Sequence, residues 1–468
     1  MSHGRCMWKI GLSVWTLVVL LSPSQAWAAV TLKSSFNVTE TYTDNLFFGD
    51  KNKEDDFGTL VGPDFTLLFQ NPDLVIGVTY TGRVSFFVNN PDQNRYNQNA
   101  NIILDLPFLT KRYKKLTVTI DEGMNFTPQL DAFSLSEAQN ASTLARGNSA
   151  LSVSGAGSGG FGGGVGGAGG SGGFGGGVGG AGSFGGTGGT QGVFTSRASA
   201  FFNRAGLTLG YAWTSRLNST LAYNNQYRHF FSSGFQDSLS HNVTFSLPYQ
   251  VTEQTTFTPS YSYRQTKFLG KSTQTTSGDQ NGTHTGQLGI NHVFTQSLSA
   301  SITGGVSFVK QKGATEQVLG PGGTTQEREI GSKFVGRFRG SATITKSFQR
   351  GTLSLSGNQT MGNGGGLAAQ ATRTRTATGE GTYLLTPRIN TFVSVGWAKN
   401  DSIGGNAFDT TTYRVQTGLG YSFTPWLFGN VSYSRIDQRS KGTVATDVVV
   451  NQVFMNLTAV ADPWTLIR

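Results

Sequence analysis

The chain has 468 residues and a formal charge of +10, with 12% aromatic and only 13% charged residues. Soluble domains carry about 25% charged residues, so this composition is unusual for one. The excess of bases contains no cluster of five or more Lys or Arg residues and no nucleic-acid-binding motif. Both absences argue against nucleic acid as a partner.

The first residues have the features of a secretory signal peptide. A basic start that ends at Lys9 precedes an apolar stretch at 10–21 and a small-x-small cleavage site at 26–28. We therefore expect residues 1–28 to be removed during export, and an uncleaved membrane anchor is the alternative. Cys6 is the only cysteine, so the exported chain would contain no disulfide. Beyond this stretch, no run of about 18 apolar residues predicts a transmembrane helix.

Alternation with a period of two recurs along the rest of the chain and predicts β-strands. In residues 413–423, for example, Val415 and Leu419 alternate with polar or small side chains. A tilted strand of about ten residues with one apolar face can cross the hydrocarbon layer of a membrane. We predict strands at 30–43, 58–70, 73–88, 96–107, 113–126, 193–213, 216–231, 237–249, 253–268, 284–295, 297–310, 329–347, 351–361, 372–385, 388–399, 410–424, 426–437 and 447–461.

Short turns and long polar connections alternate between these strands. The fold class that needs this order is a transmembrane antiparallel β-barrel, with tight periplasmic turns and longer external loops. We predict such an all-β barrel, of about 18 strands (16–18), with both ends in the periplasm. Aromatic residues next to the short turns would form an interfacial girdle, although a core of a soluble β-protein is the alternative explanation. These residues are Trp213, Tyr249, Phe294, Phe348, Phe423 and Trp426.

One connection breaks this rhythm. Residues 127–192 would form the third external loop, and 155–192 are Gly-rich, with the pattern of 159–169 repeated at 172–182. Glycine loses much conformational entropy on ordering, so we expect a long flexible Gly-rich extracellular loop, which could instead reach into the lumen. A capping-box pattern predicts a short helix at 138–144. The barrel domain would then cover 29–461, with a periplasmic tail at 462–468.

If apolar side chains face lipid, their neighbours along each strand face the lumen. This rule gives a lumen with more bases than acids, which would favour anions. The alternative is that these bases pair with carboxylates and stiffen the barrel. The lumen-facing basic candidates are Arg83, Arg228, Arg264, Lys333, Arg337, Arg339 and Arg414, and the acids are Asp105, Asp121 and Glu380.

The sequence predicts neither catalysis nor cofactor binding. The four histidines beyond the signal peptide are His229, His241, His284 and His292, and none belongs to a hydrolase pattern or to a pair at metal-ligand spacing. The Gly-rich stretch lacks the Lys-Ser/Thr pair and the helix of a phosphate-binding loop. We therefore expect no catalytic, cofactor-binding or metal-binding residues.

Residues 39–45 (TETYTDN), 56–63 (DFGTLVGP) and Tyr80 resemble the start of a family of outer-membrane β-barrel porins. Some members of this family are associated with exosortase (PEP-CTERM) and exopolysaccharide systems. The resemblance implies an outer-membrane barrel without catalytic residues, and it leaves the solute open. The Gly-rich stretch departs from the family pattern.

These observations predict a porin-like passive channel for small hydrophilic solutes, which could be anionic. The alternative is an envelope or surface structural protein, or a barrel associated with exopolysaccharide export that has no open pore. The expected location is the outer membrane of a Gram-negative-type bacterium. The expected partners are outer-membrane lipids and lipopolysaccharide, the barrel-assembly machinery, and small solutes or polysaccharide.

Overall fold

The computed structural model of the chain describes residues 29–51, 53–131, 197–231, 237–269, 280–311, 315–319, 325–329, 333–363, 371–403, 409–441 and 447–467. The expected signal peptide, the expected helix at 138–144 and the Gly-rich residues 155–192 lie outside this part of the chain. Among the described residues, no helix is both long and apolar enough to cross a membrane.

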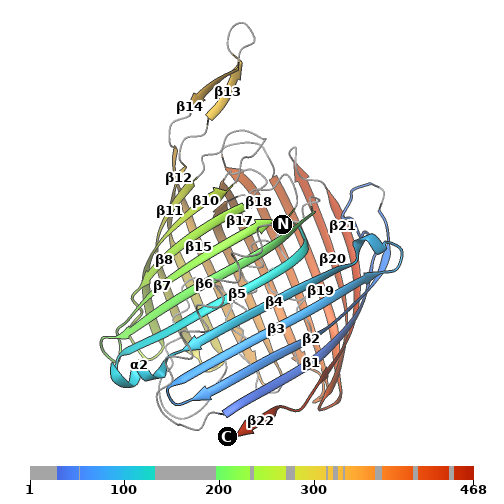
Figure 1. Cartoon of the computed structure of the whole chain (residues 1–468), viewed down its shortest axis with the longest axis horizontal. Helices are drawn as coiled ribbons and strands as arrows, with labels where there is room; N and C mark the ends of the chain where they lie inside the picture. Colours follow the sequence, from blue (N-terminus) through green and yellow to red (C-terminus); the bar gives the residue numbers. More distant parts are fainter. Residues whose placement is uncertain are drawn as a thin grey trace, which may run out of the picture.

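Eighteen long antiparallel strands form a closed β-barrel, as the alternation predicts (Figure 1). Each strand pairs with the next, and β1 closes the ring on β21 from Ser35↔Val460 to Thr43↔Gln452. The barrel strands are β1 (Ala29–Thr43), β2 (Asp56–Asn71), β3 (Leu74–Phe87), β4 (Arg95–Asp105), β5 (Leu116–Asp131), β6 (Arg197–Ala212), β7 (Asn218–Phe230), β8 (Asp237–Ser246), β10 (Thr255–Leu269), β11 (Gln280–Thr295), β12 (Leu298–Gln311), β15 (Lys333–Phe348), β16 (Gly351–Asn363), β17 (Ala371–Leu384), β18 (Ile389–Ile403), β19 (Asp409–Thr424), β20 (Leu427–Lys441) and β21 (Val448–Val460).

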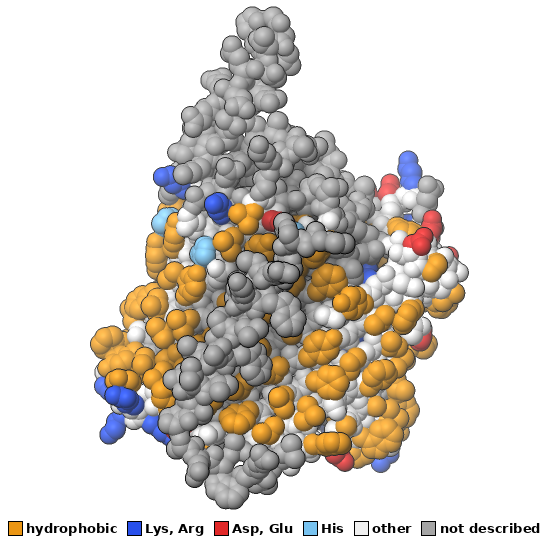
Figure 2. Space-filling model, viewed as in Figure 1, with side chains coloured by type: hydrophobic (Ala, Val, Ile, Leu, Met, Phe, Trp, Pro, Cys, Tyr) orange, Lys and Arg blue, Asp and Glu red, His pale blue; other side chains and the backbone are white. Residues whose placement is uncertain are grey.

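The alternation in sequence becomes an inner and an outer face of the barrel wall. On β19, Thr410 and Thr412 are buried on the inner face, whereas Tyr413 and Leu419 are exposed on the outer face. The same rule holds on β20, where Ser434 is buried and its neighbours in sequence are exposed. Hydrophobic side chains cover the middle of the visible outer face, and charged side chains gather toward its two ends (Figure 2).

The two ends of the barrel differ. At one end the strands are joined by short turns, such as 296–297, 349–350 and 425–426; we call this the short-turn end. The start of β1 and the last strand lie at this end (Figure 1). The other end, which we call the long-loop end, carries the long connections, including 88–94 and 312–332. The predicted alternation of short and long connections is therefore present in the structure.

Three elements add to the predicted pattern. A separate hairpin, β13 (Thr315–Leu319) with β14 (Thr325–Glu329), projects beyond the long-loop end from a stretch expected as a loop (Figure 1). A short helix, α2 (Pro107–Arg112), connects β4 and β5 at the short-turn end. Strand β5 continues to Asp131, and thus into residues 127–192, which were expected as a loop, with a register shift between Thr127 and Leu130.

The end of the chain, expected as a tail beyond the last strand, contains a short strand. This strand, β22 (Trp464–Ile467), pairs with β1 from Ala29 to Leu32. The pairing of β21 with β1 ends at Ser35, which would leave the first residues of β1 with an open edge. Strand β22 covers that edge, as backbone donors and acceptors at a sheet edge require.

Candidate functional site: the inner wall

Five arginines lie on the inner face of strands β6 to β15. Cross-strand partners share a face, and these arginines stand opposite small or polar residues such as Ser238 for Arg228 and Gly305 for Arg339. The outer-face neighbours on the same strands, such as Phe338, are large, apolar and exposed. The five are Arg204, Arg228, Arg264, Arg337 and Arg339.

Four of these arginines are close enough to one another for their charges to repel. Arg264 is repelled by Arg204 and Arg339, and Arg228 is repelled by Arg264. They belong to β6, β7, β10 and β15, so one side of the wall carries the whole group. We call Arg204, Arg228, Arg264 and Arg339 the inner arginine patch.

The members of the inner arginine patch differ in their partners among the described residues. Arg204 donates to Oδ1 of Asn224 at 2.8 Å and lies 3.9 Å from the Asp121 carboxylate. The Arg228 guanidinium lies over the Phe202 ring, 5.2 Å from its centre. Within the described chain, no carboxylate pairs with Arg228, Arg264 or Arg339. The patch therefore presents a surplus of positive charge to the lumen.

Arg83 has a different environment, and it fits the alternative of a structural ion pair. Its Nη2 lies 2.8 Å from the Asp64 carboxylate, and its Nη1 donates to the carbonyl oxygens of Pro63 at 3.1 Å and Gly82 at 2.7 Å. The side chain is only 10% exposed. Arg83 thus joins β2 to β3 and has little capacity left for a solute.

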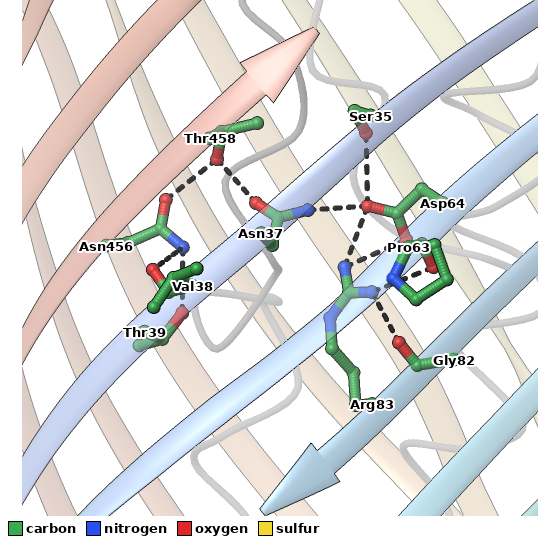
Figure 3. Close-up of polar contacts among 10 residues, drawn as sticks. All are labelled: Ser35, Asn37, Val38, Thr39, Pro63, Asp64, Gly82, Arg83, Asn456 and Thr458. Atoms are coloured by element: carbon green, nitrogen blue, oxygen red, sulfur yellow. Dashed lines mark hydrogen bonds and ion pairs between the residues drawn. The ribbon is translucent and has the colours of Figure 1, made fainter.

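The Asp64 carboxylate also connects Arg83 to the seam where the barrel closes (Figure 3). Asn37 on β1 donates to Asp64 at 2.6 Å and accepts a hydrogen bond from Thr458 on β21. Asn456, on the same strand as Thr458, donates to Thr39 Oγ1 at 2.7 Å. One hydrogen-bonded network therefore spans four strands, β21, β1, β2 and β3, along the inner face of the seam.

The remaining predicted inner residues are dispersed. Arg414 on β19 donates to Gln416 at 3.3 Å, and Asp105 accepts from Thr119 at 2.6 Å. Glu380 stands between Ser354 and Ser394 on the inner face of β17. The backbone of Lys333 begins β15, but its side chain lies outside what the structure describes.

Arg204, a member of the inner arginine patch, was not among the predicted lumen-facing bases. Arg204 has the same parity on β6 as Gly206 and Thr208, the small and polar residues that alternate with Leu207 and Leu209. Applied to this strand, the alternation rule would have placed Arg204 inside with Arg228. Its partner Asp121 is on β5, far away in sequence, so the contact between them depends on strand register.

The connection from β1 to β2 is held against the last barrel strands. The Asp44 carboxylate accepts from the backbone and side-chain nitrogens of Asn451 at 2.7 and 2.6 Å. Asn45 is fully buried and donates to the carbonyl of Val449 at 3.2 Å. Phe48 packs against an inner-face cluster of Ile436, Val448 and Val450. We call residues 44–49 the seam latch; its first two residues end the motif TETYTDN.

The histidines lie on the outer face and already have hydrogen-bond partners. Within the described part of the chain, no group of three His, Cys, Asp or Glu residues could hold a metal ion. The imidazole contacts are His229 with Asp237 at 2.6 Å, His241 with Tyr223 at 2.8 Å, His284 with Tyr261 at 2.7 Å and His292 with Thr255 at 2.8 Å.

Neither a protein-family model nor a curated protein matches the sequence. Among solved structures, the chain is similar to OccK2 (OpdF) of Pseudomonas aeruginosa, with a TM-score of 0.43, 11% identity, and 93% of this chain and 98% of that chain covered. It is also similar to the FrpB iron transporter from Neisseria meningitidis, with a TM-score of 0.46, 9% identity, and coverage of 91% and 64%. A third is a loop-deletion mutant of OmpT, an outer membrane protein of Vibrio cholerae, with a TM-score of 0.35, 12% identity, and coverage of 93% and 99%.

Proposed function

We propose that this protein is an outer-membrane porin, a passive channel that favours small hydrophilic anions. The observation that carries the proposal is the inner arginine patch, in which Arg228, Arg264 and Arg339 face the lumen without a carboxylate partner among the described residues. Barrels of 16 to 18 strands leave an aqueous channel, so a wall of this size can pass solutes.

A membrane location is supported by the outer face. Large apolar and aromatic side chains are exposed around the barrel, on β1, β6, β11, β19 and β21 among others. In water, so much exposed apolar surface would be unfavourable, whereas lipid solvates it. Aromatic rings near the short turns, such as Trp213, Phe294 and Trp426, suit the interface between headgroups and acyl chains.

Selection by the inner arginine patch would need only fixed charge. A ring or patch of arginines attracts anions and raises their local concentration, and the low-dielectric wall focuses the field. Guanidinium groups also bind carboxylates and phosphates through two parallel hydrogen bonds, which favours solutes that carry such groups. No chemical step is required of the protein, so transport would follow the concentration gradient.

We include the expected partners and the expected export route in this proposal. They are outer-membrane lipids, lipopolysaccharide, the barrel-assembly machinery and a cleaved signal peptide at residues 1–28. An association with exosortase and exopolysaccharide systems, which some members of the family that the sequence resembles have, is also part of this proposal. The alternatives are a surface protein without an open pore and an export barrel closed by residues 127–192.

Planar-bilayer recording of the purified exported chain tests these possibilities. The porin proposal expects stable single-channel conductance steps. In a KCl gradient it expects a reversal potential shifted toward the equilibrium potential of chloride. A variant that lacks the Gly-rich residues 155–192 separates the alternatives. Conductance only after this deletion would indicate a closed export barrel, and no conductance in either protein would contradict a channel function.

A further inference from the structure

Charged residues gather on the outer face of four neighbouring strands, β17 to β20, near the long-loop end. They have the same parity as the exposed apolar residues of these strands, such as Val395, Tyr413 and Tyr433, whereas the intervening Asn400 and Thr410 are buried on the inner face. We call this group the outer rim patch: Arg373, Arg375, Lys399, Asp401, Asp409, Arg435, Asp437, Arg439 and Lys441.

The strand register brings these residues side by side. Arg373 stands opposite Asp401, which stands opposite Asp409, which stands opposite Lys441. In the next row toward the middle of the barrel, Lys399 on β18 stands opposite Arg375 on β17. The outer rim patch is therefore a continuous surface across four strands and not a scatter of single charges.

Acids neutralise only part of the outer rim patch. Asp401 lies 2.8 Å from Arg373 and 2.9 Å from Arg375, so one carboxylate serves two guanidinium groups. Lys399 lies 3.2 Å from Asp409, and Arg439 lies 3.8 Å from Asp437. A fourth acid, Asp447, lies beside Arg439 and accepts from the backbone nitrogen of Ser440 at 2.6 Å. Six bases thus face four acids, a surplus of two positive charges.

Two bases of the outer rim patch are placed to bind something else. Arg435 and Lys441 are exposed and form no ion pair with the described residues. The Nε of Arg375 is buried and has no hydrogen-bond partner within the described ranges, although the same side chain binds Asp401 through Nη2. These groups are therefore available for an anionic ligand at the outer rim patch.

Rows of exposed apolar residues follow the outer rim patch along the same strands, toward the middle of the barrel. Arg435 stands opposite Val415, which in turn stands opposite Val395. Val431 and Leu419 continue the exposed apolar surface further down the same strands. Positive charge directly above an apolar surface complements a lipid with an anionic headgroup above its acyl chains.

We propose that the outer rim patch binds the phosphate groups of a phosphorylated glycolipid of the outer leaflet, with its acyl chains along the Val395–Val415–Val431 surface. The planar guanidinium of arginine suits phosphate oxygens, and a surplus of two positive charges matches a headgroup with two phosphates. This inference rests on the proposed outer-membrane location, but it does not depend on the channel being open or anion-selective.

The test is a titration of the purified barrel in detergent with bis-phosphorylated lipid A, followed by native mass spectrometry. The variant Arg435→Gln/Lys441→Gln removes the two bases without an acid partner and should weaken binding by about tenfold. The matched control, Lys267→Gln/Lys310→Gln, removes two outer-face bases from β10 and β12 and should bind like the wild type. Phosphate-free lipid A should bind wild type and variant equally weakly, and inorganic phosphate alone should not bind.

Equal loss of binding in the two variants would overturn the proposal, as would equal affinity for lipid A with and without phosphate. Binding of inorganic phosphate at comparable concentration would overturn the assignment to a lipid. The heat-modifiable electrophoretic mobility of each variant shows whether the barrel is folded, and Lys441→Gln alone, at a strand end, provides a milder second variant. Ion selectivity in bilayers should stay unchanged in the patch variant, which separates failure of this inference from failure of the channel proposal.

Discussion

The carboxylate of Asp64 lies 2.8 Å from the guanidinium of Arg83, whereas Arg264, on the same inner wall, is repelled by its charged neighbours and has no carboxylate partner among the described residues. The barrel thus holds two kinds of inner arginine. Arg83 belongs to a network that fastens the seam, and Arg264 belongs to a patch with surplus charge. The two kinds should respond differently to substitution.

Asp64→Asn should destabilise the barrel by about 2 kcal/mol, because it leaves the mostly buried Arg83 without its counter-charge. The free energy of unfolding in urea, measured for the folded protein in detergent, checks this. The double variant Asp64→Asn/Arg83→Gln should recover part of the loss, since it removes the unpaired charge. Strictly additive effects of the two substitutions would mean that the pair contributes nothing.

Asn45→Ala should loosen the seam latch. The substitution removes the hydrogen bonds of Asn45 to Val449 and Gly49 from a fully buried position, at a cost of about 1–3 kcal/mol. Hydrogen exchange of residues 44–51 should become faster. Asn94→Ala, which removes an exposed amide from the connection after β3, is the matched control and should leave that region unchanged. Unchanged exchange in Asn45→Ala would show that the latch is held by other contacts.

Gly305→Ala should strain the pairing of β11 with β12. A Cβ at Gly305 would lie 2.1 Å from the carbonyl oxygen of Gly286, a backbone atom that cannot move without shifting the strand. We expect a loss of about 1–3 kcal/mol, measured as a lower melting temperature. Gly286→Ala is a matched control on the neighbouring strand, because a Cβ at this position would have no atom within 4 Å. Equal melting temperatures for the two variants would contradict the account.

The strands could be predicted because each one has an apolar outer face and a small or polar inner face. That condition produces visible alternation in β19 and β6, and it also places Arg204 inside by parity. The alternation gives no signal for elements outside the barrel wall. The hairpin β13–β14 projects beyond the barrel, so its sequence shows no apolar face.

Contacts between strands could not be predicted, because they depend on register. Nothing in the local sequence shows that Asp64 reaches both Arg83 and Asn37, or that Asp44 binds Asn451, which is 407 residues away. Such pairs decide whether an inner base is structural or available to a solute. The sequence therefore predicts which residues face inward. The structure is needed to show that Arg83 is held in a structural ion pair, whereas Arg264 is not.

The reversal potential of a double variant, Arg264→Gln/Arg339→Gln, in a KCl gradient shows whether the inner arginine patch selects anions. These two inner bases have no carboxylate partner among the described residues and should account for about a threefold preference for chloride over potassium. Their removal should therefore shift the reversal potential toward the equilibrium potential of potassium. Lys267→Gln/Lys310→Gln, which removes two bases from the outer face, should leave the potential at its wild-type value. The same potential in all three proteins would contradict selection of anions by the inner arginine patch.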